Sequence, residues 1–106
     1  MTQREHRLST KIRKNLDLAF GRDIFLFKVW GNEHQMAGLP DLLGVYKGRF
    51  FGIETKLPES RDNVSPRQAY VGGLITAAGG AWAVCTTTHE AVRFIESLDD
   101  ADINAT

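Results

Sequence analysis

The chain has 106 residues, of which 42% are hydrophobic and 25% are charged, and these proportions are ordinary for a globular domain. No apolar run approaches membrane-spanning length and the polar N-terminus shows no signal segment, so we expect one cytoplasmic domain over residues 1–106. Cys85 is the only cysteine, so the sequence allows neither an intrachain disulfide nor a cysteine-based zinc site. The net charge of zero argues against a protein that coats nucleic acid indiscriminately.

The charges are unevenly distributed along the chain. Residues 1–28 contain seven Lys or Arg against three Asp or Glu, whereas residues 66–106 contain two against five. A basic front and an acidic back would orient a polyanion rather than simply attract it.

The first predicted element is a helix from about Gln3 to Phe20, because apolar residues recur there at spacings of three and four. Glu5 lies on the apolar stripe, and it is either an exposed residue of a fraying first turn or an acidic group over a metal site. A neighbouring basic stripe is either a surface for flanking phosphates or a solvated helix face. This stripe consists of Arg4, Arg7, Lys11 and Lys14.

Residues 24–30 are predicted to form a mainly apolar strand that carries Lys28. The polar segment 31–38 is bounded by glycines and is predicted to be a loop beside the site, in which His34 is placed to touch substrate. A second polar loop, residues 58–64, contains Arg61. We take these three side chains, with the basic stripe, as candidate contacts to nucleic acid.

Strands over residues 42–46 and 50–57 are predicted to pair through a two-residue turn at Lys47-Gly48. Counting inward from this turn places Asp41 directly opposite Glu54, with Cβ atoms about 5 Å apart, and puts Lys56 on the same face. Facing carboxylates repel each other unless a cation lies between them. Two carboxylates suffice for Mg²⁺, which usually keeps several waters, so the hairpin predicts a metal site.

Two features of this hairpin also have simpler interpretations. Glu54 and Lys56 together could be a solvated face with a weak ion pair, and Pro40-Asp41 is a common turn dipeptide. Gly52 lies on the site face, where its missing side chain would leave room for a ligand or another backbone.

Ser65 is predicted to cap a helix over residues 66–78, with Gln68 at the capping-box position, so capping alone would explain Gln68. A buried strand over 81–86 and a last helix capped by Thr88 follow. The order α-β-β-β-α-β-α contains a strand-helix-strand crossover, which implies at least one parallel pair in a mixed sheet. The acidic residues of the tail are expected to be solvated at a frayed terminus: Asp99, Asp100 and Asp102.

This order and these motifs resemble the PD-(D/E)XK nuclease superfamily, and within it the small VRR-NUC domains, including the stand-alone versions found in phages. Pro40-Asp41 and Glu54-Thr55-Lys56 match the superfamily signature. The similarity extends over nearly the whole chain, through Gly38–Leu42, Lys47–Phe51, Ser65–Gln68 and Ala78–Gly80.

The resemblance implies an α/β restriction-endonuclease-like core, with a mixed four-stranded sheet flanked by helices, and metal-dependent hydrolysis of DNA phosphodiesters. Asp41 and Glu54 would bind Mg²⁺ or Mn²⁺ with the Thr55 carbonyl, and Glu5 is similar to an acidic residue that the family often carries on its first helix. Lys56 would orient the attacking water or stabilise charge on the phosphate. Gln68 would be an additional active-site residue.

Stand-alone members of the family are similar to Holliday junction resolvases, which implies a homodimer that cuts branched DNA such as four-way junctions. The alternatives are a non-enzymatic DNA-binding module, a flap or other structure-specific nuclease subunit in a larger complex, and a purely structural partner. The intact set of Asp41, Glu54 and Lys56 argues against an idle site, because opposed carboxylates have a cost without a function.

Overall fold

The computed structural model describes the backbone of residues 2–31 and 35–105, and the side chains as far as residue 99. The predicted order of elements is confirmed. Along the chain lie α1 (Gln3–Phe20), β1 (Ile24–Lys28), β2 (Leu42–Tyr46), β3 (Arg49–Thr55), α2 (Pro66–Ala77), β4 (Ala81–Cys85) and α3 (Thr88–Ala105). Short 3₁₀ turns occupy Gly21–Asp23 and Pro58–Ser60.

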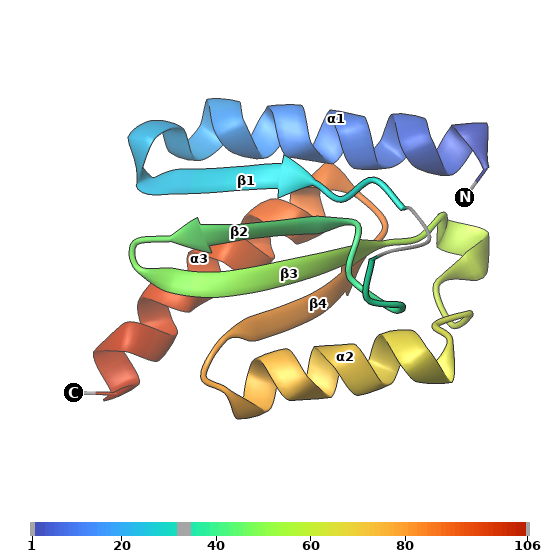
Figure 1. Ribbon diagram of the computed structural model, residues 1–106. Coiled ribbons are helices and arrows are strands. Elements are labelled where there is room, and N and C mark those ends of the chain that lie inside the picture. The colour runs from blue at the N-terminus through green and yellow to red at the C-terminus, as the bar shows by residue number, and fades with distance from the viewer. Residues whose placement is uncertain (1, 32–34, 106) are drawn as a thin grey trace.

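The strands form one mixed sheet in the order β1-β2-β3-β4, in which β3 and β4 are parallel and the other pairs are antiparallel. Helices α1 and α3 contact each other on one face of the sheet, and α2 packs along β4 on the other (Figure 1). The crossover from β3 through α2 to β4 therefore makes the predicted parallel pair, and it brings the start of α2 close to the end of β3.

The hairpin between β2 and β3 has the predicted register. Lys47 and Gly48 both have positive φ, of 48° and 85°, as a type I′ turn requires. Val45 pairs with Phe50, and Leu43 pairs with Gly52. The ladder ends at Leu42 and Ile53, so Asp41 and Glu54 are the next positions along the two strands.

The main core lies between the sheet and the α1–α3 pair, where apolar residues of alternating strand positions meet the helix stripes. Phe51 and Ile53 on β3 are fully buried there, against Ile12 and Leu16 of α1 and Ile95 of α3. Burial of these side chains is the main source of stability for a chain of this size. On the opposite face, α2 covers only β4 and part of β3.

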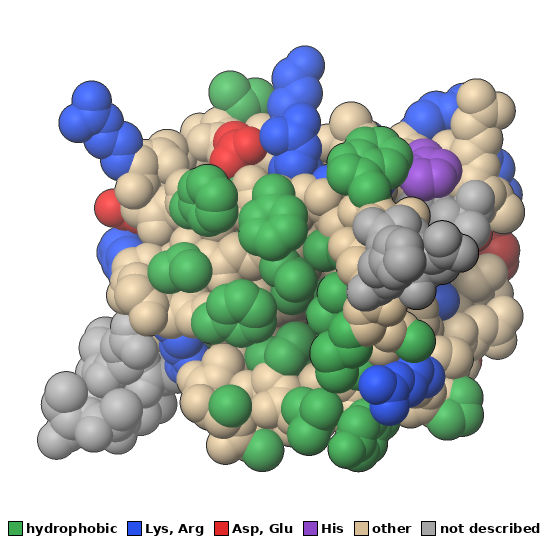
Figure 2. Space-filling model, viewed as in Figure 1, with side chains coloured by type: hydrophobic (Ala, Val, Ile, Leu, Met, Phe, Trp, Pro, Cys, Tyr) green, Lys and Arg blue, Asp and Glu red, His purple; other side chains and the backbone are tan. Residues whose placement is uncertain are grey.

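A patch of the second sheet face is left uncovered by α2. It is made of apolar side chains from β1, β2 and β3: Phe25, Phe27, Val45 and Phe50. Figure 2 shows hydrophobic side chains gathered across the middle of this face. Contiguous exposed apolar surface of this kind marks an interaction site more often than chance exposure does.

Several expectations about element ends and the acidic tail are wrong. The second strand of the hairpin covers Arg49–Thr55 rather than residues 50–57, so Lys56 follows the strand. The first strand stops at Lys28 rather than Trp30, because its ladder with β2 ends at the Lys28–Leu42 pair and continues only as a single hydrogen bond from the Val29 amide to the Asp41 carbonyl. The last helix is capped by Thr87, whose Oγ1 accepts from the Glu90 amide at 3.1 Å, and Thr88 is its first residue. Asp99 is not simply solvated, because it accepts hydrogen bonds from the Tyr46 hydroxyl and the Lys47 ammonium.

Of the other tail residues, Asp100 and Asp102 have side chains outside the described part of the structure. Within residues 2–31 and 35–105, none of the helices is long and apolar enough to cross a membrane.

Candidate active site

A cleft of about 440 Å³ opens where the start of α1, the end of β3 and the start of α2 meet. It is lined by Thr2, Glu5, Asp41, Glu54, Lys56 and Gln68. The structure thus brings together the four side chains predicted to be catalytic, together with Glu5. Their roles in a reaction stay predictions, and their geometry shows what the arrangement can do.

Asp41 is held by contacts at both its main chain and its side chain. Its carbonyl oxygen accepts from the Val29 amide at 2.8 Å, which ties it to the chain just beyond β1. Its Oδ2 accepts from the Thr55 amide at 2.8 Å and from the Thr55 hydroxyl at 2.7 Å. The carboxylate is therefore fixed across the end of β3. The structure gives Thr55 this holding role, and the use of its carbonyl as a metal ligand stays a prediction.

Glu54 is only 2% exposed, although it carries an ionisable group. Its Oε1 accepts from Gln68 Nε2 at 3.0 Å, whereas its Oε2 is buried and meets no hydrogen-bond donor among the described residues. Burial, followed by the adjacent Asp41 carboxylate, raises the pKa of Glu54 to about 8, and Lys56 opposes the shift. The positive charge of Lys56 therefore offsets only part of the cost of burying the Glu54 carboxylate.

Gln68 forms the predicted capping box and also contacts Glu54, and its role as an active-site residue stays a prediction. Its Oε1 accepts from the backbone amide of Ser65 at 2.9 Å, and the backbone amide of Gln68 donates to Ser65 Oγ at 3.1 Å. These two hydrogen bonds complete the predicted capping box. Its Nε2 is left to reach Glu54. One side chain therefore starts the helix and orients the carboxylate of Glu54.

The donor set fits a hard divalent cation. Carboxylate oxygens are the ligands that Mg²⁺ and Mn²⁺ prefer, and a cation beside Glu54 Oε2 would supply the partner which that atom lacks. Among the described residues, however, no group of three or more His, Cys, Asp and Glu side chains is placed to hold a metal ion. The site is thus built from the Asp41–Glu54 pair, with remaining positions left to water.

Glu5 lines the cleft, but its side chain is used by α1 itself. Its Oε1 accepts from the Thr2 amide at 3.2 Å, and the Glu5 amide donates to Thr2 Oγ1 at 3.2 Å. The first turn is therefore capped rather than fraying, and Glu5 stays a predicted ligand only. A Thr-x-x-Glu capping box was readable at Thr2–Glu5, and it indicates the helix start that the apolar stripe alone does not.

Gly52 makes room for Pro40 rather than for a ligand. A Cβ at Gly52 would lie 2.8 Å from Pro40 Cγ, closer than such atoms can approach. Pro40 is fully buried on this glycine and directly precedes Asp41. The space at Gly52 is therefore filled by neighbouring side chains, so neither expectation, a ligand or another backbone, is correct. The contact with Pro40 helps to position Asp41, a metal-ligand candidate.

We expect Gly52→Ala to destabilise the protein by about 1–3 kcal/mol, because the added methyl group overpacks the contact with Pro40. Chemical denaturation measures this change. Gly73→Ala is the matched control, since a Cβ at that helical position meets nothing within 4 Å and should stabilise by roughly 0.5–1 kcal/mol. Equal stability of the two variants would contradict the role given to Gly52.

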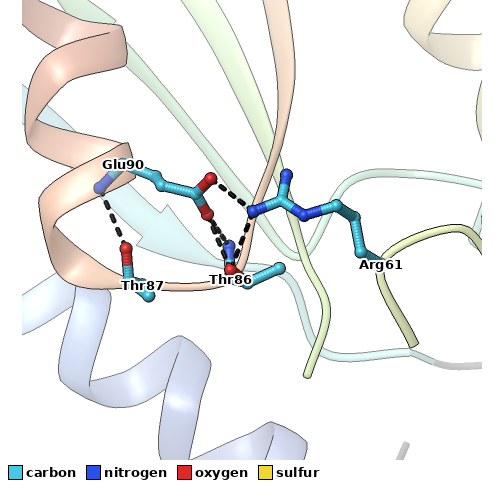
Figure 3. A network of polar contacts seen from close by, with 4 residues as sticks. All are labelled: Arg61, Thr86, Thr87 and Glu90. Atoms are coloured by element: carbon cyan, nitrogen blue, oxygen red, sulfur yellow. Dashed lines mark hydrogen bonds and ion pairs between the residues drawn. The ribbon is translucent and has the colours of Figure 1, made fainter. Parts of the chain in front are cut away.

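A polar network holds the loop that follows Lys56 (Figure 3). Arg61 binds the Glu90 carboxylate and donates to Thr86 Oγ1 at 2.9 Å, while Glu90 Oε1 accepts from the Thr86 amide and hydroxyl. These contacts lower the pKa of Glu90 to about 2. The network joins this loop to the start of α3. Contact of Arg61 with nucleic acid stays a prediction, and the ion pair with Glu90 offsets the positive charge that such a contact would use.

The remaining basic candidates are found in different surroundings. Arg4 forms an exposed ion pair with Glu59 at 2.8 Å, and His34 lies outside the described residues. Lys28 is 9% exposed, and its ammonium contacts His6 Nδ1 at 2.9 Å. The other members of the stripe share a groove of about 590 Å³ with Lys28: Arg7, Lys11 and Lys14.

Comparison with solved structures finds a similar fold. A chain described as a "VRR_NUC domain" superposes with a TM-score of 0.62, over 90% of this chain and 97% of that one, at 23% sequence identity. This protein has that fold. No family model and no curated protein matches the chain. At this level of identity the likeness establishes the architecture alone, and the chemistry of the cleft depends on the residues that line it.

Proposed function

We propose that this chain is a single metal-dependent endodeoxyribonuclease domain that uses Mg²⁺ or Mn²⁺ to hydrolyse DNA phosphodiesters. One observation carries the proposal: Glu54, buried opposite Asp41, leaves Oε2 without a donor in a cleft that Lys56 also lines. The fold that this chain shares with a chain described as a "VRR_NUC domain" supports the proposal. We also propose a cytoplasmic location.

The residues of the cleft have distinct roles in this proposal. A bound cation would polarise a phosphoryl oxygen and acidify a bound water. The cation would be held by Asp41 and Glu54. Thr55 fixes the Asp41 carboxylate, and Gln68 orients the Glu54 carboxylate. Glu54 would have to lose its proton to solvent in order to hold a cation, because a ligand carboxylate must be ionised. Lys56 places a positive charge where negative charge develops on the phosphate.

We further propose that the substrate is branched DNA, such as a four-way junction, and that two chains act together. A domain of this size contacts only a short stretch of duplex, so a pair of sites would be needed to span a branch. The apolar patch of Phe25, Phe27, Val45 and Phe50 supports self-association. The same patch would serve a different protein if the chain were a nuclease subunit of a larger complex, and the mass of the purified protein in solution separates these cases.

Incubation with four-way, flapped and linear DNA tests the proposed activity. We expect strand cleavage with Mg²⁺ or Mn²⁺, none with EDTA, and preference for the four-way junction. Cleavage that persists in EDTA would contradict the metal requirement. Binding without cleavage under every condition would instead favour a non-enzymatic DNA-binding module.

A further inference from the structure

Trp30 is an exposed aromatic residue beside the candidate active site. It follows β1 and is 64% exposed. The amide of its neighbour Val29 donates to the Asp41 carbonyl at 2.8 Å, so the main chain holds Trp30 close to Asp41. A hollow of about 470 Å³ is lined by both of these residues.

One face of the Trp30 ring packs against the His6 ring and the Lys28 ammonium. The His6 ring stacks on it with centroids 5.8 Å apart and an interplanar angle of 23°, and Lys28 Nζ lies 4.6 Å from its centroid. Because Lys28 Nζ and His6 Nδ1 are only 2.9 Å apart, both groups lie on the same side of the indole. The opposite ring face is thus the exposed one.

The same indole borders the basic groove on α1. The groove is lined by Trp30, His6 and Lys28 together with Arg7, Lys11 and Lys14. Among the described residues, no Asp or Glu lines it. Trp30 therefore lines both the basic groove and the hollow that contains Asp41. Cationic grooves that pass an aromatic platform are suited to nucleic-acid single strands, whose phosphates and bases need these two kinds of contact.

We propose that Trp30 is a stacking platform for an unpaired nucleobase of a DNA strand whose phosphates follow the groove toward Asp41. This inference rests on the proposed function, because it assumes that DNA is the substrate. A base inside an intact duplex is already stacked on its neighbours, so the platform favours strands with an unpaired or splayed base next to the cut. Lys28 Nζ lies 4.6 Å from the ring centroid, so its positive charge adds to the attraction of this site for a phosphate-bearing strand.

Binding measured in EDTA tests the platform without requiring catalysis. The probes are a fluorescent oligothymidylate and a fluorescent blunt hairpin duplex of the same length, followed by anisotropy. We expect Trp30→Ala to weaken oligothymidylate binding by about tenfold and to leave duplex binding unchanged, while Trp30→Phe retains most of the affinity. Lys11→Ala should weaken both complexes, since it removes a phosphate contact.

Tyr70→Ala is the matched control. Tyr70 is also exposed and also has a cation near its ring, Arg67, but it lines neither the hollow nor the groove, so both affinities should be unchanged. An equal effect of Trp30→Ala on both probes, or no effect on either, would overturn the platform. Absence of binding by the wild-type protein would overturn it as well. If Trp30→Ala selectively loses single-strand binding but the wild-type protein does not cut DNA, the result supports the stacking platform and contradicts only the proposed nuclease activity.

Discussion

Asp41→Ala should reduce DNA cleavage by more than about a hundredfold while the fold persists. Loss of a partner in the outer shell of a metal site alone costs 10–100-fold, and Asp41 is proposed to be a direct ligand. Its carboxylate also receives two hydrogen bonds from Thr55, which hold it at the end of β3. Rates on a four-way junction with Mg²⁺ measure the loss, and circular dichroism reports the fold.

Asp23→Ala provides the comparison for this experiment. Asp23 is exposed and lies just before β1, at the end of the sheet opposite to Asp41, so the change removes one carboxylate without touching the cleft. Its rate should equal that of the wild-type protein. Comparable losses in the two variants would indicate a general effect of charge, and a wild-type rate for Asp41→Ala would remove Asp41 from the proposed mechanism.

Glu54→Gln should stabilise the metal-free protein at alkaline pH. The carboxyl pKa is about 8 in the folded state against an ordinary value of 4.5, so the folded state holds the proton more tightly than the unfolded one does. The stabilisation from this group is complete below about pH 4.5 and is lost as the pH rises to about 8. Glutamine cannot ionise, so the variant avoids that loss.

Melting in EDTA across this pH range measures the effect. The stability of Glu54→Gln relative to the wild-type protein should rise between pH 5 and pH 9, by an amount on the order of 3 kcal/mol. Addition of Mg²⁺ should reverse the order, because the wild-type protein gains binding energy that the variant lacks. Glu59→Gln serves as the control, since Glu59 is exposed and lies outside the cleft. A stability difference that does not change with pH would show that burial does not perturb Glu54.

The hairpin was predictable because its information is local. A two-residue turn at Lys47-Gly48 sets the register, and the period of two along each strand then assigns every side chain to a face. The capping box at Ser65 and Gln68 was predictable for the same reason, since four consecutive residues contain the whole motif. Thr87 and Thr88 are both able to cap the last helix, and adjacent candidates of one kind cannot be separated by pattern.

Contacts between segments that are distant in the sequence could not be predicted from turn and capping motifs. Gln68 reaches Glu54 only because the crossover returns α2 beside the end of β3. Gly52 had two open interpretations until Pro40 was found packed on it. Nothing around Trp30 marked it as more than the end of a strand, since its support by His6 and its position beside Asp41 depend on how α1 lies across β1.

The sequence by itself determined the order of elements, the hairpin register and the pair of opposed carboxylates, because turns, caps and strand alternation act over a few neighbouring residues. Only the tertiary structure decided that Glu54 is buried with an unpartnered oxygen, that Glu5 is engaged in a cap, and that Trp30 lines a hollow together with Asp41. Those properties depend on desolvation and on side chains that meet across the fold, and neither is a function of local spacing.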